Sequence, residues 1–187
     1  MTVRLIALAI AMLAVVACED ITRSIDPTAE VTEDTLTVFT LRGSPLSAPT
    51  ALDLFRVRAL RVGDFGQPYD IAVDSSGGAV LLYPSQLINI EALPTGILEV
   101  TTPFEDVASA PASGYVDSVA VAMAAGETVV IRGRNACSGN FAGRDFFFAK
   151  IQLLELGSSA GHRTARFRIR TNPNCGFRSF ADGLPEF

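Results

Sequence analysis

The sequence predicts an all-β protein, a single antiparallel sandwich or barrel-like domain on a short N-terminal tether. Three observations predict this fold class. Short runs of alternating apolar and polar residues recur along the chain, clusters of Gly, Pro and Ser separate them, and helical periodicity is scarce. No internal repeat divides these runs, so we expect one all-β domain over residues 35–187.

The first half of this domain contains four expected strands. Residues 35–41 are rich in β-branched and aromatic side chains, and residues 55–62 alternate between apolar and basic ones. Residues 69–74 and 79–83 flank a Ser-Ser-Gly-Gly turn, which is typical of a β-hairpin. Residues 84–93 fit either one short helix or another strand.

Four more strands are expected in the second half, at residues 116–123, 128–132, 146–156 and 163–170. The third is the strongest core candidate, because its apolar side chains alternate on one face, namely Phe147, Ala149, Ile151 and Leu153. Between the last two strands, Gly157 to Gly161 is expected to form a flexible loop.

The N-terminus has the pattern of a secretory signal. Arg4 precedes an apolar run, Leu5 to Val16, which is shorter than the roughly 20 residues that a membrane span needs. The ending Val15-Val16-Ala17-Cys18 resembles the lipobox of bacterial lipoproteins. That resemblance implies that residues 1–17 are a lipoprotein signal peptide, cleaved before Cys18, and that Cys18 is acylated.

An acidic segment follows the expected cleavage site. Six acids and Arg23 alone lie between Cys18 and Thr40, and we expect residues 18–34 to form a flexible acidic tether. The protein is therefore expected to be exported and lipid-anchored to the bacterial cell envelope, facing the periplasm or lying on the outer-membrane surface. Its partner through the anchor is the membrane. A formal net charge of -5 argues against a nucleic-acid partner.

Two cysteines remain after Cys18. Cys137 and Cys175 form an even pair in an exported chain, and such pairs are usually oxidised to a disulfide bond. The alternative is a thiolate metal site. Two cysteines and one histidine are too few ligands for it, so we expect the disulfide and no metal.

The usual catalytic motifs are missing from the sequence. It has no Gly-x-Ser-x-Gly elbow, phosphate loop or dinucleotide fingerprint. Glu105 and Asp106 are neighbours and are interpreted as solvated loop acids rather than a glycosidase pair. Asp70 and Asp74 flank the expected hairpin and are interpreted as serving its turn. We therefore expect no catalytic residue and no enzyme activity.

Three arginines share one face of the last expected strand. Arg166, Arg168 and Arg170 are spaced by two residues, so their side chains lie on the same side. The row could bind phosphate or carboxylate groups. The alternative is an exposed sheet face whose like charges prevent aggregation.

Several short segments together resemble the HmuY-like family of lipid-anchored haem-binding proteins. They are residues 69–73, 104–111, 126–132 and 147–153. The resemblance implies an all-β domain that holds haem iron between His or Met side chains. In this chain the ligands would be His162 and Met123, the only histidine and the only methionine after the signal. Both have an alternative role, His162 as a solvated turn residue and Met123 in core packing.

The sequence thus favours a lipid-anchored envelope protein that is a non-catalytic binding or structural module, with a protein or a small ligand as its partner. One alternative is an HmuY-like protein that binds haem or another apolar small ligand. A second alternative, an enzyme acting on envelope material, has the least support.

Overall fold

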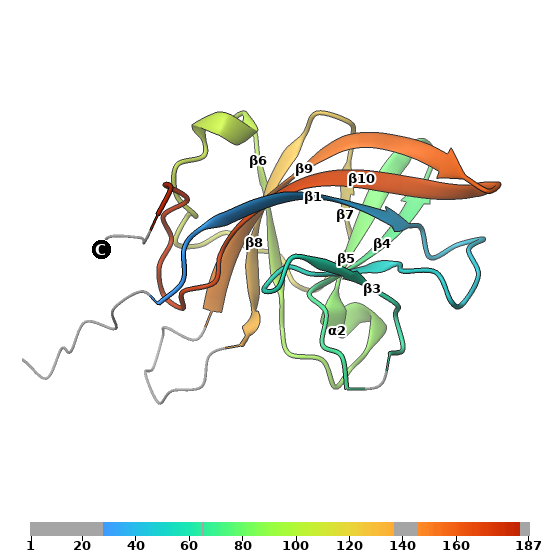
Figure 1. Ribbon diagram of the computed structural model, residues 1–187, viewed down its shortest axis with the longest axis horizontal. Coiled ribbons are helices and arrows are strands. Elements are labelled where there is room, and N and C mark those ends of the chain that lie inside the picture. Colours follow the sequence, from blue (N-terminus) through green and yellow to red (C-terminus); the bar gives the residue numbers. More distant parts are fainter. Residues whose placement is uncertain (1–27, 65, 137–145, 184–187) are drawn as a thin grey trace, which may run out of the picture.

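The chain folds into a β-sandwich, as the sequence predicts. The computed structural model describes residues 28–64, 66–136 and 146–183, which form two antiparallel five-stranded sheets (Figure 1). Sheet A contains, in spatial order, β1 (Thr32–Phe39), β10 (His162–Asn172), β9 (Phe146–Ser159), β8 (Thr128–Asn135) and β6 (Gly96–Val100). Sheet B contains β3 (Arg58–Leu60), β2 (Ala51–Asp53), β4 (Ile71–Ser76), β5 (Ala79–Pro84) and β7 (Val121–Met123). Two short helices, α2 (Ser85–Ile88) and η1 (Phe104–Asp106), lie in the connections.

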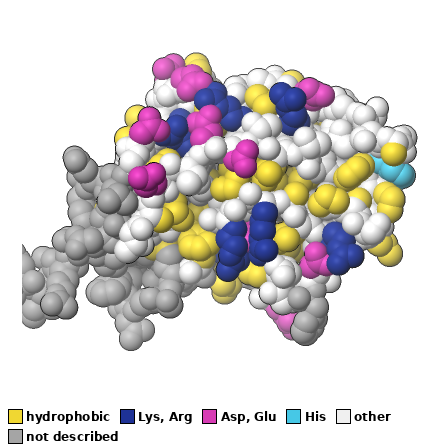
Figure 2. Space-filling model, viewed as in Figure 1, with side chains coloured by type: hydrophobic (Ala, Val, Ile, Leu, Met, Phe, Trp, Pro, Cys, Tyr) yellow, Lys and Arg dark blue, Asp and Glu magenta, His cyan; other side chains and the backbone are white. Residues whose placement is uncertain are grey.

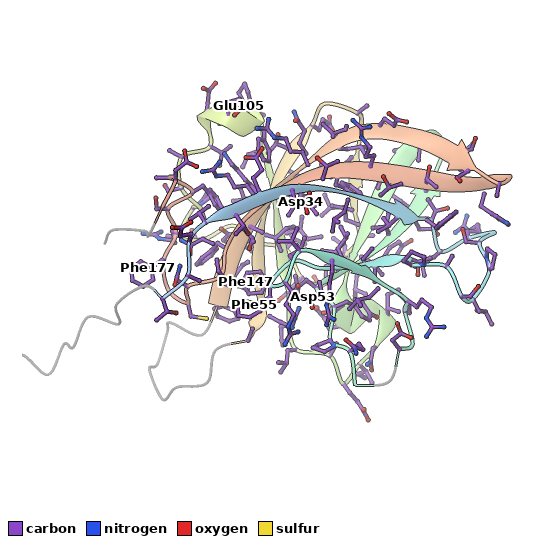
Figure 3. All side chains as sticks on the ribbon, in the orientation of Figure 1. Asp34, Asp53, Phe55, Glu105, Phe147 and Phe177 are labelled. Carbon is purple, nitrogen blue, oxygen red and sulfur yellow. The ribbon has the colours of Figure 1, made fainter. Side chains whose placement is uncertain are left out.

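The core lies between the sheets and uses the expected face of β9. Phe147, Ala149, Ile151 and Leu153 are all at most 1% exposed. The ring of Phe147 packs edge-on against Phe55, with 5.3 Å between the ring centroids (Figure 3). Gly133 on β8 makes room for that ring, because a Cβ at this position would lie 2.0 Å from it.

Two tight hairpins have turn residues with positive φ angles. β4 and β5 form the expected hairpin, and Gly77 and Gly78 take φ values of 59° and 88° at its turn. The loop expected over residues 157–161 is wrong. β9 continues to Ser159, and only Ala160 and Gly161 turn the chain. The reason is that Gly157 and Ser158 pair with β10 through backbone hydrogen bonds, which do not depend on large side chains.

Two expected strands are shorter than their patterns. Of residues 55–62 only β3 is a strand, since the chain turns after Leu54 and Val57 adopts a φ of 49°. Of residues 116–123 only β7 is a strand, and Val119 is 56% exposed. Residues 84–93 contain the single turn of helix α2, the first of the two alternatives for this segment.

The domain begins earlier than the expected boundary at residue 35. β1 starts at Thr32, and Asn174 holds the residues before it. Its side-chain Oδ1 accepts hydrogen bonds from the backbone N–H groups of Thr28 and Ala29 at 2.8 and 3.0 Å. Cys18, the expected signal peptide and the rest of the expected tether lie outside the described residues. Within the part of the chain that is described, no helix is long and apolar enough to cross a membrane.

Candidate functional site

A cleft of about 610 Å³ opens beside sheet B. Helix α2, at the lower edge of the molecule in Figure 1, contributes Ile88 to it. The cleft lies between the β3–β4 loop and the segment that leads from α2 to β6. The residues that line it are Val62, Gly63, Asp64, Gly66, Gln67, Pro68, Tyr69, Ile88, Asn89, Glu91, Ala92, Leu93 and Arg134.

The first wall is the β3–β4 loop, which is folded by its own polar groups. The backbone N–H of Asp64 donates to the carbonyl of Arg61 at 3.3 Å, and the two side chains form an ion pair. The N–H of Gln67 then donates to the carbonyl of Asp64 at 3.2 Å. Arg58 Nη2 donates to Gln67 Oε1 at 2.8 Å, which fastens the loop to β3. These contacts fasten the described residues of the wall to β3.

The second wall is fixed by the side chain of Gln86. Its Oε1 accepts from the N–H of Thr95 at 3.0 Å, and its Nε2 donates to the carbonyls of Thr95 and Asp117 at 3.0 and 2.7 Å. These bonds tie α2 to the start of β6. The segment between them leaves two apolar side chains open along the cleft, Ile88 at 38% and Leu93 at 49% exposure.

The floor is Arg134, a buried cation that joins the two sheets. It lies on β8 of sheet A and is 4% exposed. Its Nη1 lies 2.6 Å from Asp70 Oδ2 and its Nη2 lies 2.8 Å from Asp53 Oδ1, both on the sheet B side. Both aspartates are fully buried (Asp53 is labelled in Figure 3). A buried pair of this kind fixes the local arrangement, because breaking it leaves a buried charge without its partner.

The ionised form of Asp53 is more strongly stabilised than that of Asp70. Asp53 also binds Arg58 Nε at 2.9 Å and Arg56 Nη1 at 3.2 Å. Burial alone would raise its pKa, but the hydrogen bonds and charge of Arg134, together with Arg58 and Arg56, outweigh burial and hold the pKa of Asp53 below its ordinary value.

Asp70 behaves in the opposite way. Burial raises its pKa above the ordinary value, against the charge of Arg134 and the backbone N–H donors of Leu54 and Arg134. For Arg134, burial acts to lower the pKa, but Asp70 and Asp53 outweigh it and raise the pKa. The guanidinium therefore stays charged, and both of its Nη atoms are engaged by protein carboxylates.

Tyr69 is the unusual polar residue of the cleft. It is 8% exposed, and its hydroxyl oxygen is buried without a hydrogen-bond partner among the described residues. Leaving such a group unpaired costs about 1–3 kcal/mol, so each case needs an explanation. Burial also raises the pKa of Tyr69, which keeps the hydroxyl protonated and able to donate.

The expected haem ligands lie elsewhere. His162 starts β10, with Nδ1 2.6 Å from the carbonyl oxygen of Gly43, and it is the cyan side chain at the right of Figure 2. Met123 is 1% exposed in the core between the sheets, which fits its alternative role in packing. Neither residue lines the cleft, so this cleft does not bring the two together.

The arginine row is on one face, as expected, but it is largely neutralised. Arg168 Nε lies 2.5 Å from Glu33 Oε1, and Arg168 also pairs with Glu105. Arg170 Nη1 lies 3.0 Å from Glu33 Oε2, and its Nη2 lies 2.5 Å from Asp182. Basic and acidic side chains are accordingly intermingled at the upper left of Figure 2. Arg166 has no ion pair among the described residues, so the row does not act as three open cations.

Two interpretations of acidic residues need correction. Asp70 does not serve the hairpin turn, because its side chain points to Arg134 across the sandwich. Asp74 is 5% exposed and reaches back to the N–H of Arg42 at 3.1 Å instead of the turn. Glu105 is an exposed acid, as expected, although it pairs with Arg168.

Of the two cysteines of the expected disulfide, one lies in the described part of the chain. Cys175 packs against the main core, and Cys137 lies outside the described residues. Among the residues that are described, no three His, Cys, Asp or Glu side chains are grouped as metal ligands.

The sequence missed the residues that build the cleft. The sequence pattern does not mark Asp53, Tyr69 or Arg134 as site residues. For Asp53 and Arg134 the available signal is a charge within an otherwise apolar strand run. Comparisons with protein-family models, with curated proteins and with solved structures find no match. The resemblance to the HmuY-like family therefore has no support beyond its short motifs.

Proposed function

We propose that this chain is a lipid-anchored, non-catalytic binding module of the bacterial cell envelope that holds a small, largely apolar ligand in the cleft. The observation that carries the proposal is the cleft itself. Its volume of about 610 Å³ lies within the range of small-molecule sites, roughly 300–1,000 Å³. Ile88 and Leu93 stay partly exposed along it, although burying them would be favourable.

The bonds that hold the cleft also support binding. The Gln86 bonds, the Arg61–Asp64 pair and the Asp53–Arg134–Asp70 network fix its two walls and its floor. A preformed site loses less conformational entropy when it binds. The described lining has no His, Cys, Ser or Lys, and its one cation is already paired, which favours binding over catalysis.

A fluorescence titration with N-phenyl-1-naphthylamine, an apolar probe, tests this function. We expect the mature protein to bind the probe with an emission increase. Leu93→Asp should weaken binding about tenfold or more, because it places a charge beside the apolar part of the ligand. Leu46→Asp is the matched control, since Leu46 is 98% exposed and does not line the cleft. Failure of the parent to bind, or equal loss in both variants, would contradict the proposal.

A further inference from the structure

We infer that the cleft selects an amphiphile whose polar end is uncharged or cationic, and that the hydroxyl of Tyr69 bonds that end. The inference rests on the proposed function and adds to it a ligand class and a recognition residue. It depends on three properties of the described lining: its charge, its unpaired hydroxyl and the position of its apolar side chains.

The charge of the cleft disfavours anions. The lining contains one cation, Arg134, whose two Nη atoms already bind Asp70 and Asp53. Arg58, just outside the lining, is held by Asp53 and Gln67. An anionic group that entered would lose its hydration without gaining a free cationic partner.

The acidic side chains of the lining also disfavour an anionic ligand. Asp64 is paired with Arg61, whereas Glu91 is exposed and has no ion pair among the described residues. Glu91 is thus the one charged side chain of the described lining without an ion-pair partner among the described residues, and it is negative. It repels a carboxylate or phosphate group and attracts an ammonium group.

The hydroxyl of Tyr69 is the group that bonds the polar end of the ligand. The oxygen of this hydroxyl is buried and has no hydrogen-bond partner in the described part of the chain, whereas the hydroxyl of Tyr115 donates to the carbonyl of Pro111 at 2.9 Å. The fold can therefore satisfy a buried tyrosine, and at Tyr69 it does not. Because a phenol both donates and accepts, it can pair with an alcohol, an amide or an amine. Tyr69 is itself one of the residues that line the cleft.

The apolar end then lies along the mouth. Ile88 and Leu93 come from the second wall, and Val62 and Pro68 come from the first. These side chains offer a path for an alkyl or ring system, and they carry no hydrogen-bonding group beyond their backbone. The arrangement separates a polar recognition point from an apolar track, which is the geometry that an amphiphile needs.

Three ten-carbon ligands test the preference by displacing N-phenyl-1-naphthylamine from the mature protein. They are decan-1-ol, decylammonium and decanoate, which share a chain and differ in the charge of the polar end. We expect decan-1-ol and decylammonium to bind at least tenfold more tightly than decanoate at pH 7. Decanoate binding as tightly as decan-1-ol would overturn the charge argument.

Tyr69→Phe tests the recognition residue. It should weaken decan-1-ol about fivefold, the effect of one hydrogen bond, after each variant's own affinity for the naphthylamine probe has been measured and used to convert displacement into affinity. Tyr83→Phe is the matched control, because Tyr83 packs in the same cluster as Tyr69 but does not line the cleft. Circular dichroism shows that each variant is folded. Equal decan-1-ol affinity in Tyr69→Phe and the parent would overturn the role of the hydroxyl.

The two proposals fail in different ways. If the parent binds the naphthylamine probe but the three ligands and Tyr69→Phe show no preference, the proposed function stands and this inference is wrong. If the parent binds none of the four compounds, the proposed function is wrong and the inference falls with it.

Discussion

Arg134 Nη1 lies 2.6 Å from Asp70 Oδ2, and this buried contact connects the two sheets of the sandwich. Asp70→Ala removes one of the two carboxylates that bind the buried guanidinium and leaves Nη1 without this partner. We expect the free energy of unfolding to fall by about 3–5 kcal/mol. Urea denaturation measures this, and Arg61→Gln, which breaks the exposed pair with Asp64, should have little effect. A loss at Asp70 no larger than at Arg61 would show that the buried network is not stabilising.

Acidification should destabilise the protein through its ion-paired carboxylates. Burial acts to raise the pKa of Glu33, but Arg168 and Arg170 outweigh burial and hold this pKa below its ordinary value of 4.5. Arg134 acts in the same way on the pKa of Asp53. A lowered pKa gives stability that is present above the ordinary value and lost as pH falls through the folded one. Asp70 has the opposite sign, so its contribution is greatest at low pH and decreases as pH rises through its raised pKa.

Glu33→Gln isolates one of these carboxylates. The variant should be less stable than the parent at pH 6, and the two unfolding free energies should converge as pH falls below about 4. Denaturant titrations across this range provide the measurement. Glu99→Gln is the control, because Glu99 is exposed and has no ion pair among the described residues. A difference between Glu33→Gln and the parent that stays constant with pH would contradict the assignment.

The β-sandwich architecture was predictable because the alternation of apolar and polar residues is a local property of the sequence. Phe147, Ile151 and Phe167 face the core as their spacing indicates, and the Gly77-Gly78 turn requires the positive φ angles that glycine tolerates. Residues 55–62 alternate but contain only the short strand β3, because the chain turns beside Asp53 and alternation does not encode that turn.

The candidate site was not predictable, because its residues meet only through the packing of the two sheets. Arg134 is 64 residues from Asp70 and 81 residues from Asp53 in the chain. Asp70 stood near a Gly-rich turn, so the local pattern assigned it to that turn. The walls of the cleft come from two loops that Arg58 and Gln86 hold through side-chain hydrogen bonds, and no periodicity encodes such contacts.

Cys137 and Cys175 should form a disulfide bond in the purified, oxidised protein. Closing a loop of about 39 residues would contribute roughly 4 kcal/mol to stability in the chain-entropy model. Thiol titration of the mature protein after unfolding in denaturant, without reductant, should find no free thiol on either residue. Two reactive thiols would exclude the bond. Cys137→Ser with Cys175→Ser should then lower the urea midpoint relative to the parent.

The lipid anchor predicts how the protein fractionates. Expressed with its signal in a Gram-negative host, it should partition into the detergent phase, because each buried methylene of the acyl chains contributes about 0.8 kcal/mol. Cys18→Ser should move it to the aqueous phase, whereas Cys175→Ser should not. If the Cys18 variant stays with membranes as strongly as the parent, acylation is not the anchor.

Gly133 should be intolerant of a side chain because of Phe147. A Cβ at residue 133 would lie 2.0 Å from the Phe147 ring, which is fully buried and rests against Phe55. With no space for the ring to retreat, Gly133→Ala should cost about 1–3 kcal/mol of unfolding free energy. In a Phe147→Leu background the added methyl group has room, so the same substitution should cost less there. The double-mutant cycle measures this coupling by urea denaturation. Equal costs in the two backgrounds would mean that the penalty arises from the β8 backbone and not from the contact with Phe147.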